Sequence, residues 1–186
     1  MSTEIEPHPP AEPEPRPQDG AGRSRWQTVQ PWITLVARLA LVGVLGYAGI
    51  SKMGAPALSV QAVEAYELFP DGVNQFIGYT LPFFEVALAL LLLVGLASRY
   101  TAAVAALLMV VFIAGIISAW ARGLTIDCGC FGTGGQVAPG ETRYGVDILR
   151  DIGFAALAGI VMLWPRSPFS LDSALGLYSS DERSKD

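Results

Sequence analysis

The two cysteines of the chain are the residues whose types and spacing could support chemistry. Cys128 and Cys130 are separated only by Gly129, within the stretch DCGCFG at 127–132. A disulfide needs its Cα atoms about 4.4–6.8 Å apart, so this pair can be bridged only if the backbone turns sharply. Gly129 removes the steric barrier to that turn. A bridge over so short a loop is strained, and it is therefore easier to reduce than a structural disulfide.

Three interpretations of the pair are open. A structural disulfide usually tethers distant segments, because closing a longer loop removes more entropy, and this pair tethers almost nothing. Soft thiolates also suit Cu(I), but no Met or His flanks the pair. We therefore predict that Cys128 and Cys130 carry out redox chemistry without a bound metal. The neighbouring Asp127 either raises the pKa of the Cys128 thiol through its charge or relays a proton.

The composition excludes several other kinds of site. The chain has 186 residues, of which 52% are hydrophobic and only 16% charged, with a mean hydropathy of +0.42. Soluble domains carry about 25% charged residues, so the composition indicates a membrane protein. The single histidine, His8, argues against a bis-His haem, a His-rich zinc site and a Ser-His-Asp triad. A net charge of −5 and the lack of a basic run argue against nucleic acid as a partner.

Four apolar segments must position the cysteines. They cover about 32–51, 74–97, 101–120 and 147–164. A segment that crosses a bilayer must satisfy its own backbone hydrogen bonds, so these segments are predicted to be helices. The expected fold is an all-α, integral membrane four-helix bundle over 32–164. A Pro/Glu-rich N-terminal tail (1–31) is expected to be disordered, and a polar C-terminal tail covers 165–186.

Ionisable residues lie within or beside these segments. Charges at such depth usually face the bundle interior and pair with one another. Arg38 lies roughly 10 Å and Glu85 roughly 20 Å from the same membrane face, so their contact would need both side chains to extend. Arg150, on the side of the cysteines, could lower a thiol pKa or hold a quinone or a partner carboxylate. Asp151 follows it, and Lys52 is expected to be a snorkelling anchor. The alternative is a purely structural set of ion pairs.

Loop charges predict the orientation. The turn at 97–100 has one base and no acid, whereas the loop at 53–73 has three acids and no base. Both tails are therefore predicted to be cytoplasmic in a multi-pass protein of the cell (plasma) membrane. The 121–146 loop with its cysteines is then extracytoplasmic, where disulfides form and persist. The bases assigned to the cytoplasmic side are Arg16, Arg23, Arg25, Arg99 and Arg166.

The motifs resemble the MauE family, methylamine utilisation proteins within the wider DoxX-like membrane group, over roughly 33–164. The cysteine block is the most specific motif, and the shorter ones follow in family order. Family members often carry Asn where this chain has Asp151. The shorter motifs are Arg38-Leu39, Ala48-Gly49-Ile50-Ser51-Lys52, Leu81-Pro82-Phe83-Phe84-Glu85, Gly95-Leu96, Arg122-Gly123 and Leu149-Arg150-Asp151.

The resemblance implies a helical bundle that works with a thioredoxin-like or disulfide-isomerase-like extracytoplasmic protein. Its role would be thiol–disulfide exchange that supports maturation of secreted or periplasmic proteins. DoxX-type relatives also imply contact with membrane quinone. We predict an oxidoreductase component with Cys128 and Cys130 as catalytic residues. The supporting residues are Asp127, Gly129, Arg150, Arg38, Glu85 and Lys52. The alternatives are a quinone-linked oxidoreductase subunit that uses the buried charges, and a non-catalytic membrane adaptor.

Overall fold

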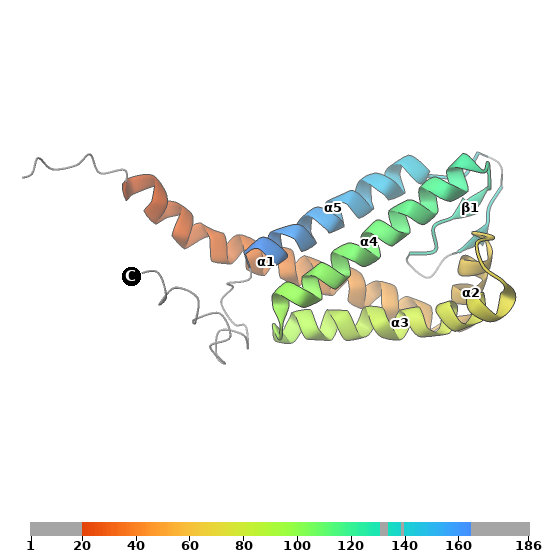
Figure 1. Cartoon of the computed structure of the whole chain (residues 1–186), viewed down its shortest axis with the longest axis horizontal. Helices are drawn as coiled ribbons and strands as arrows, with labels where there is room; N and C mark the ends of the chain where they lie inside the picture. The colour runs from red at the N-terminus through yellow and green to blue at the C-terminus, as the bar shows by residue number, and fades with distance from the viewer. Residues whose placement is uncertain (1–19, 131–133, 139, 165–186) are drawn as a thin grey trace, which may run out of the picture.

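The computed structural model describes residues 20–130, 134–138 and 140–164. Four long helices run side by side: α1 (Gly20–Met53), α3 (Asp71–Val94), α4 (Ser98–Ala121) and α5 (Tyr144–Leu163) (Figure 1). A short helix, α2 (Pro56–Glu64), and two short strands, β1 (Ile126–Asp127) and β2 (Gly135–Gln136), gather at one end of the bundle. We call α2, the 65–70 loop and the β1–β2 hairpin the cap.

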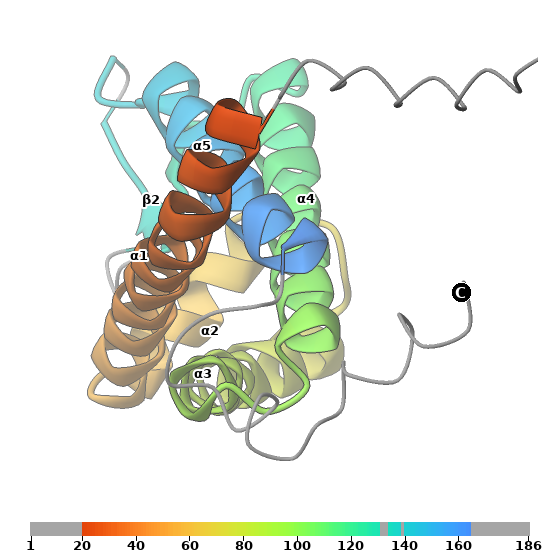
Figure 2. The same cartoon turned by 90° about the vertical axis from the view of Figure 1, so that its left-hand side faces the viewer.

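The bundle is held by a core of leucine and small residues. The helix α1 packs along α3, and α4 packs along α5, as the end-on view in Figure 2 shows. Leu41, Leu45 and Leu92 are almost fully buried among the fully buried Ala102 and Ala105. Small residues let helix backbones approach closely in a membrane, where apolar burial gives no driving force for association. The alanines of α4 therefore allow it to pack closely in the bundle.

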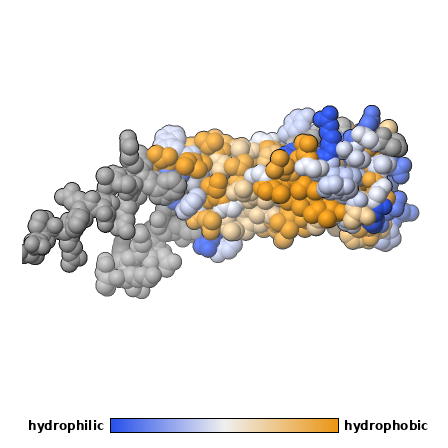
Figure 3. Space-filling view, turned by 90° about the horizontal axis from the view of Figure 1, so that it is seen from above, coloured by the Kyte–Doolittle hydropathy of each residue, from blue (hydrophilic) through white to orange (hydrophobic). Residues whose placement is uncertain are grey.

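The surface of the bundle is that of a membrane protein. Three helical stretches are long and apolar enough to cross a bilayer: Val29–Met53, Asp71–Val94 and Ser98–Ala121. Hydrophobic residues dominate the side of the bundle in Figure 3, and hydrophilic residues gather at the cap. The remaining long helix, α5, carries Asp147, Arg150 and Asp151 in its first turns. The prediction of an all-α membrane fold is confirmed.

Two local differences from the prediction have simple causes. The helix α1 begins at Gly20, so residues 20–31 of the tail predicted to be disordered are helical. The Pro/Glu-rich run ends at Pro17, and the residues after it include Ala and Arg, which are good helix formers. The rest of that tail, 1–19, and the C-terminal tail from 165 lie outside the described residues. The helix α2 lies in the segment predicted as the 53–73 loop and begins with Pro56, a residue favoured at the first helical position.

A proline in α3 leaves a backbone carbonyl of this helix open to a hydrogen bond from α2. Pro82 has no N–H, so the carbonyl of Gly78 loses its normal intrahelical donor. The hydroxyl of Ser59 donates to that carbonyl instead, at 2.8 Å. A Cβ atom at position 78 would lie only 2.7 Å from the Cα atom of Val60, so the two helices meet at backbone distance there. The position of the cap on α3 thus depends on the pair Ser59 and Gly78.

The hairpin is tied to the other side of the bundle. The strands pair antiparallel, with Ile126 opposite Gln136. The Tyr144 hydroxyl, at the start of α5, accepts a hydrogen bond from the Ile126 N–H at 3.1 Å and donates to the Leu124 carbonyl at 2.5 Å. The segment that carries the cysteines follows β1 directly. Its position is therefore set relative to the first turns of α5.

Candidate functional site

The two cysteines lie in a tight turn directly after β1. Gly129 has φ +68°, in the left-handed region that glycine adopts without strain, as the predicted sharp turn requires. Both cysteines are free thiols. Cys128 is half-buried and Cys130 is 9% exposed. The Cys130 sulfur lies 3.8 Å from the Cys128 carbonyl oxygen, so the turn folds the second cysteine back onto the first.

An arginine from α5 contacts the first cysteine. Arg150 donates from Nη2 to the Cys128 sulfur at 3.4 Å. The same guanidinium donates from Nη1 to Asp147 Oδ1 at 3.0 Å and from Nε to Asp151 Oδ1 at 3.0 Å. The two carboxylates hold the planar side chain in place, and Nη2, which also lies 2.9 Å from Asp151 Oδ1, is the atom that reaches the sulfur. The structure thus brings Arg150 to the cysteines.

These contacts make the two thiols unequal. A hydrogen bond from the Cys130 thiol lowers the pKa of Cys128, and the bond from Arg150 lowers it further, against the effect of burial and of the Asp147 charge. That same bond and burial both raise the pKa of Cys130. Cys128 is therefore the thiol of the pair that loses its proton more readily. Of the carboxylates nearby, Asp147 opposes the Cys128 thiolate more directly than the predicted Asp127.

A tyrosine of the cap completes the surroundings of Cys128. The Tyr66 hydroxyl donates to the Cys128 carbonyl at 3.2 Å. Burial and the nearby cysteines raise the pKa of Tyr66, so its hydroxyl stays protonated. Arg122, at the end of α4, donates to the carbonyls of Tyr66 and Glu67 and so holds this loop. Tyr66 is not among the predicted site residues, because a single aromatic residue in a loop carries no spacing signal.

A buried ion pair lies close to the cysteines. Lys52 Nζ is 2.7 Å from Glu85 Oε1, and the side chains are only 5% and 1% exposed. The ammonium also lies 5.6 Å from the ring centroid of Phe112 on α4. The expectation that Lys52 snorkels to a membrane interface is wrong. The cap covers this end of α1, so the ammonium has no water layer to reach and pairs with α3 instead.

Lys52 and the cysteines share a small cavity. Its volume is about 50 Å³, and its polar lining consists of Lys52, Ser59, Tyr66 and the two cysteines. The apolar lining includes Phe112. The cavity connects the buried ion pair of α1 and α3 with the sulfur atoms of the loop after β1. Because these residues are scattered along the sequence, only the fold reveals that they belong together.

Arg38 does not join this group. It lies fourteen residues before Lys52 on α1, roughly 20 Å along the helix. It is buried, at 2% exposure, in the half of the bundle away from the cap. The carboxylate of Glu85 is instead bonded to Lys52. The predicted supporting residues Arg38 and Glu85 therefore serve different parts of the molecule.

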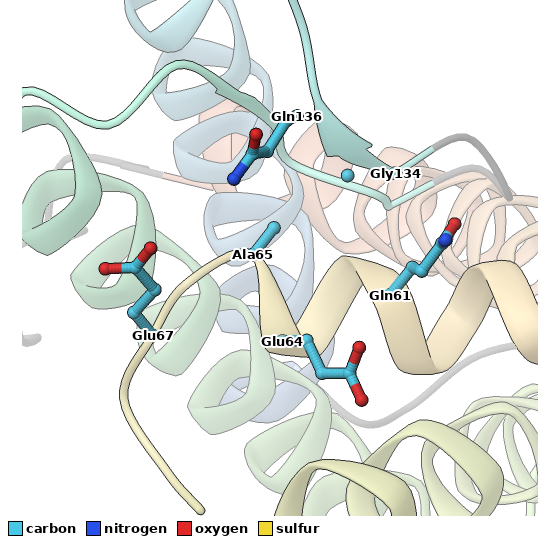
Figure 4. A pocket seen from close by; sticks show the side chains of 7 residues that line it. Gln61, Glu64, Ala65, Glu67, Gly134 and Gln136 are labelled. Carbon is cyan, nitrogen blue, oxygen red and sulfur yellow. The ribbon is translucent and has the colours of Figure 1, made fainter. Parts of the chain in front are cut away.

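Two open clefts flank the hairpin on the outside of the cap. The cleft in Figure 4 has a volume of about 450 Å³ and is lined by Gln61, Glu64, Ala65, Glu67, Gly134, Gly135 and Gln136. None of these lining residues carries a thiol or a hydroxyl. The second cleft, of about 540 Å³, includes Asp127 and Asp147 in its lining. Ligand atoms of Asp127, Cys128 and Asp147 lie within 4.8 Å of one another, but the guanidinium of Arg150 is already bonded to two of the three.

Comparisons with known proteins agree with the motifs. The family of the methylamine utilisation protein MauE matches residues 30–165. The methylamine utilization protein MauE of Paracoccus denitrificans is 32% identical over 107 residues, which are 57% of this chain and 58% of that protein. The match thus spans less than two thirds of the relative. No solved structure matches the chain. Since the family match covers α1 from residue 30, the three other long helices and the cysteine loop, the chain belongs to the MauE family of membrane proteins.

Proposed function

We propose that this protein is a membrane thiol–disulfide relay, with Cys128 as the nucleophile and Cys130 as the resolving thiol. The observation that carries the proposal is the hydrogen bond from Arg150 to the Cys128 sulfur, at 3.4 Å. A thiolate beside a cation and partly open to its surroundings is the reactive form of cysteine. An inert structural thiol would need neither the arginine nor the glycine turn.

The exchange balances without a third reactant. The Cys128 thiolate attacks one sulfur of a partner disulfide, forms a mixed disulfide and releases one partner thiolate. Cys130 then loses its proton and attacks the Cys128 sulfur. The Cys128–Cys130 bond forms, and the second partner sulfur leaves as a thiolate. The chain has lost two electrons, the partner has gained them as two thiolates, and the proton of Cys130 is the one proton released. The reverse sequence oxidises the partner.

The partner class and the orientation come from the family resemblance and the loop charges. We propose a thioredoxin-like extracytoplasmic protein as the partner, with the cap outside the cytoplasm and both termini inside. The name of the relative ties that protein to methylamine utilisation. We extend this to a role in maturing a disulfide-containing secreted or periplasmic protein. When the net flow oxidises the partner, membrane quinone is the electron acceptor that this proposal requires.

The arrangement of charges favours the cysteines over the quinone-linked alternative. That alternative places the chemistry at Arg38, Glu85 and Arg150. In the structure Glu85 pairs with Lys52, and Arg150 pairs with the two aspartates beside it on α5. Arg38 lies roughly 20 Å along α1 from that pair. These charges do not surround one common space, whereas the cysteines and Lys52 do.

Trapping the mixed disulfide tests the proposal. The full chain carrying Cys130→Ser is expressed in its membrane, and adducts are separated without reductant. We expect a reductant-sensitive adduct, because the nucleophile is intact and the resolving thiol is gone. Cys128→Ser and the double variant serve as matched controls and give none. An adduct of equal yield in Cys128→Ser, or none in any variant while the partner still acquires its disulfides normally, overturns the proposal.

A further inference from the structure

The buried ion pair of Lys52 and Glu85 has no part in the proposed thiol–disulfide exchange. Lys52 and Glu85 are both desolvated, with side chains 5% and 1% exposed. Moving two charges out of water costs several kcal/mol each, so apolar residues of similar volume would join α1 to α3 at least as well. Charge at this position is therefore better explained by a role in the chemistry than by stability.

The resolving step requires a proton acceptor for Cys130, and the Lys52–Glu85 pair can supply one. Cys130 must lose a proton before its sulfur can attack, yet it is 9% exposed and lies beside the Cys128 sulfur. Its thiol lines the cavity of about 50 Å³ that Lys52 also lines. A single water needs about 10–15 Å³ of such space, so the cavity has room for about three. Water there can connect the thiol with the ammonium.

The hydrogen bonds around the cavity identify the acceptor. The hydroxyls of Ser59 and Tyr66 already donate to backbone carbonyls. Glu85 Oε1 accepts from Lys52, but Glu85 Oε2 is buried and has no hydrogen-bond partner. A buried carboxylate oxygen without a donor is a proton acceptor with nothing competing for it. The ammonium of Lys52 lies between this carboxylate and the cavity.

The other elements around the pair supply no simpler base. From α4 only the ring of Phe112 faces the ammonium. From α5, Arg150 is a cation, and Asp151 is bonded to it through Oδ1 while lying within electrostatic range of Lys52. Asp151 Oδ2 also lacks a partner, but Asp151 is not among the residues that line the cavity. Lys52 is the charged group that lines the cavity and is also bonded to a carboxylate whose second oxygen has no partner.

We propose that the Lys52–Glu85 pair accepts the proton of the Cys130 thiol through the cavity during the resolving step, an inference that rests on the proposed exchange. The thiol proton passes by water to the Lys52 nitrogen as Lys52 hands a proton to Glu85. Cys130 then attacks as a thiolate, the Cys128–Cys130 bond forms, and the partner leaves as a thiolate. Lys52 remains an ammonium and Glu85 becomes a neutral acid. The reverse step returns the proton to Cys130.

A two-phase assay separates this step from the exchange itself. The reduced full chain in nanodiscs is mixed with excess dithiobis(nitrobenzoate), a disulfide that releases a coloured thiolate. The first release reports attack by Cys128, and the second reports closure by Cys130. Both phases are recorded against pH for the parent chain, for Glu85→Gln and for Glu67→Gln. The last variant is the matched control, because Glu67 is exposed and lies outside the cavity.

We expect Glu85→Gln to leave the first phase within about twofold and to slow the second about a hundredfold at neutral pH, in the range for loss of a general base. The second phase should then accelerate about tenfold per pH unit, because hydroxide replaces the lost acceptor. Glu67→Gln should match the parent. Since Glu85→Gln leaves an unpaired ammonium, Lys52→Met combined with Glu85→Leu is measured as well, and it should show the same slow second phase.

The outcomes separate the two ideas. If neither the parent chain nor any of the variants shows a first phase that can be assigned to Cys128, the proposed exchange is wrong. If the first phase is present and the second keeps its parental rate and pH profile in the double variant, the proton-transfer role is overturned while the exchange stands. The proton-transfer role is also overturned if Glu67→Gln slows the second phase as much as Glu85→Gln does, because the effect would then not come from the buried pair.

Discussion

Replacing Arg150 should lower the reactivity of the Cys128 thiol while leaving the thiol in place. Arg150 donates to the Cys128 sulfur at 3.4 Å, and its own side chain is 22% exposed. A hydrogen bond to a charged group contributes about 1.5–3 kcal/mol, and the partial exposure places this bond near the lower end. Since about 1.4 kcal/mol corresponds to a factor of ten, Arg150→Leu should lower the thiolate population of Cys128 about tenfold at neutral pH.

The assay is alkylation of Cys128 by iodoacetamide as a function of pH. It is measured in the Cys130→Ser background, where one thiol reacts and a hydroxyl still offers a donor at position 130. We expect the rate to fall about tenfold at neutral pH and to recover as the pH rises, because the pKa of Cys128 increases when a cation is lost beside it. Arg150→Lys should lie between the two, since an ammonium keeps the charge but lacks the planar fork.

Folding must be monitored in parallel, because Arg150 also holds two carboxylates. Its Nη1 and Nε atoms bond to Asp147 and Asp151. Arg150→Leu combined with Asp147→Asn removes the more exposed of these charges and also the carboxylate that opposes the Cys128 thiolate. This double variant should regain part of the reactivity. If both variants keep their helical circular dichroism and alkylate along the parental pH curve, the contact at 3.4 Å does not activate the sulfur.

Three further predictions concern the scaffold and the pH response. Gly78→Ala should lower the free energy of unfolding by about 1–3 kcal/mol, because its Cβ atom would lie 2.7 Å from a backbone atom of α2; Gly72→Ala, with open space around it, is the control in thermal melts. Lys52→Met should destabilise the chain by about 3–5 kcal/mol by leaving the buried Glu85 charge unpaired, and adding Glu85→Leu should restore most of that loss. The pKa of Cys128 is lowered from the ordinary value of a cysteine, about 8.5. Alkylation of Cys128 should therefore stay fast as the pH falls below that value and slow only in more acidic buffer. An alkylation rate that halves near pH 8.5 would contradict a lowered pKa for Cys128.

The long helices could be predicted from composition alone, but their ends and the cap could not. The segments predicted at 74–97, 101–120 and 147–164 correspond to α3, α4 and α5 within three residues at each end. Apolar runs of this length have few alternatives in a membrane protein. The helix α2 was missed because nine residues are too few for a hydropathy signal. Its Pro56 at the first helical position was the available clue.

The site was predictable where its residues are adjacent in sequence and unpredictable where they meet only in the fold. The cysteine turn and its glycine follow from local geometry, and Gly129 has the expected backbone conformation. The placement of Arg150 near the cysteines follows from its position near the end of α5 that faces them. The partner of Glu85 did not follow, because depth counted from helix ends cannot show that the cap buries Lys52. Tyr66 had no sequence signal.

The asymmetry between the two thiols has to come from side chains in this architecture. A redox cysteine at a helix N-terminus has its pKa lowered by the N–H groups of the first turn. Here the cysteines follow strand β1 and do not open a helix of their own. Arg150 and the Cys130 thiol supply the stabilisation instead, and both depend on how the hairpin lies against α5. The Tyr144 hydroxyl joins α5 to the segment at Leu124 and Ile126 that leads into the cysteines. We therefore expect it to affect the proposed chemistry at a distance, because a shift of the hairpin would separate Arg150 from the Cys128 sulfur.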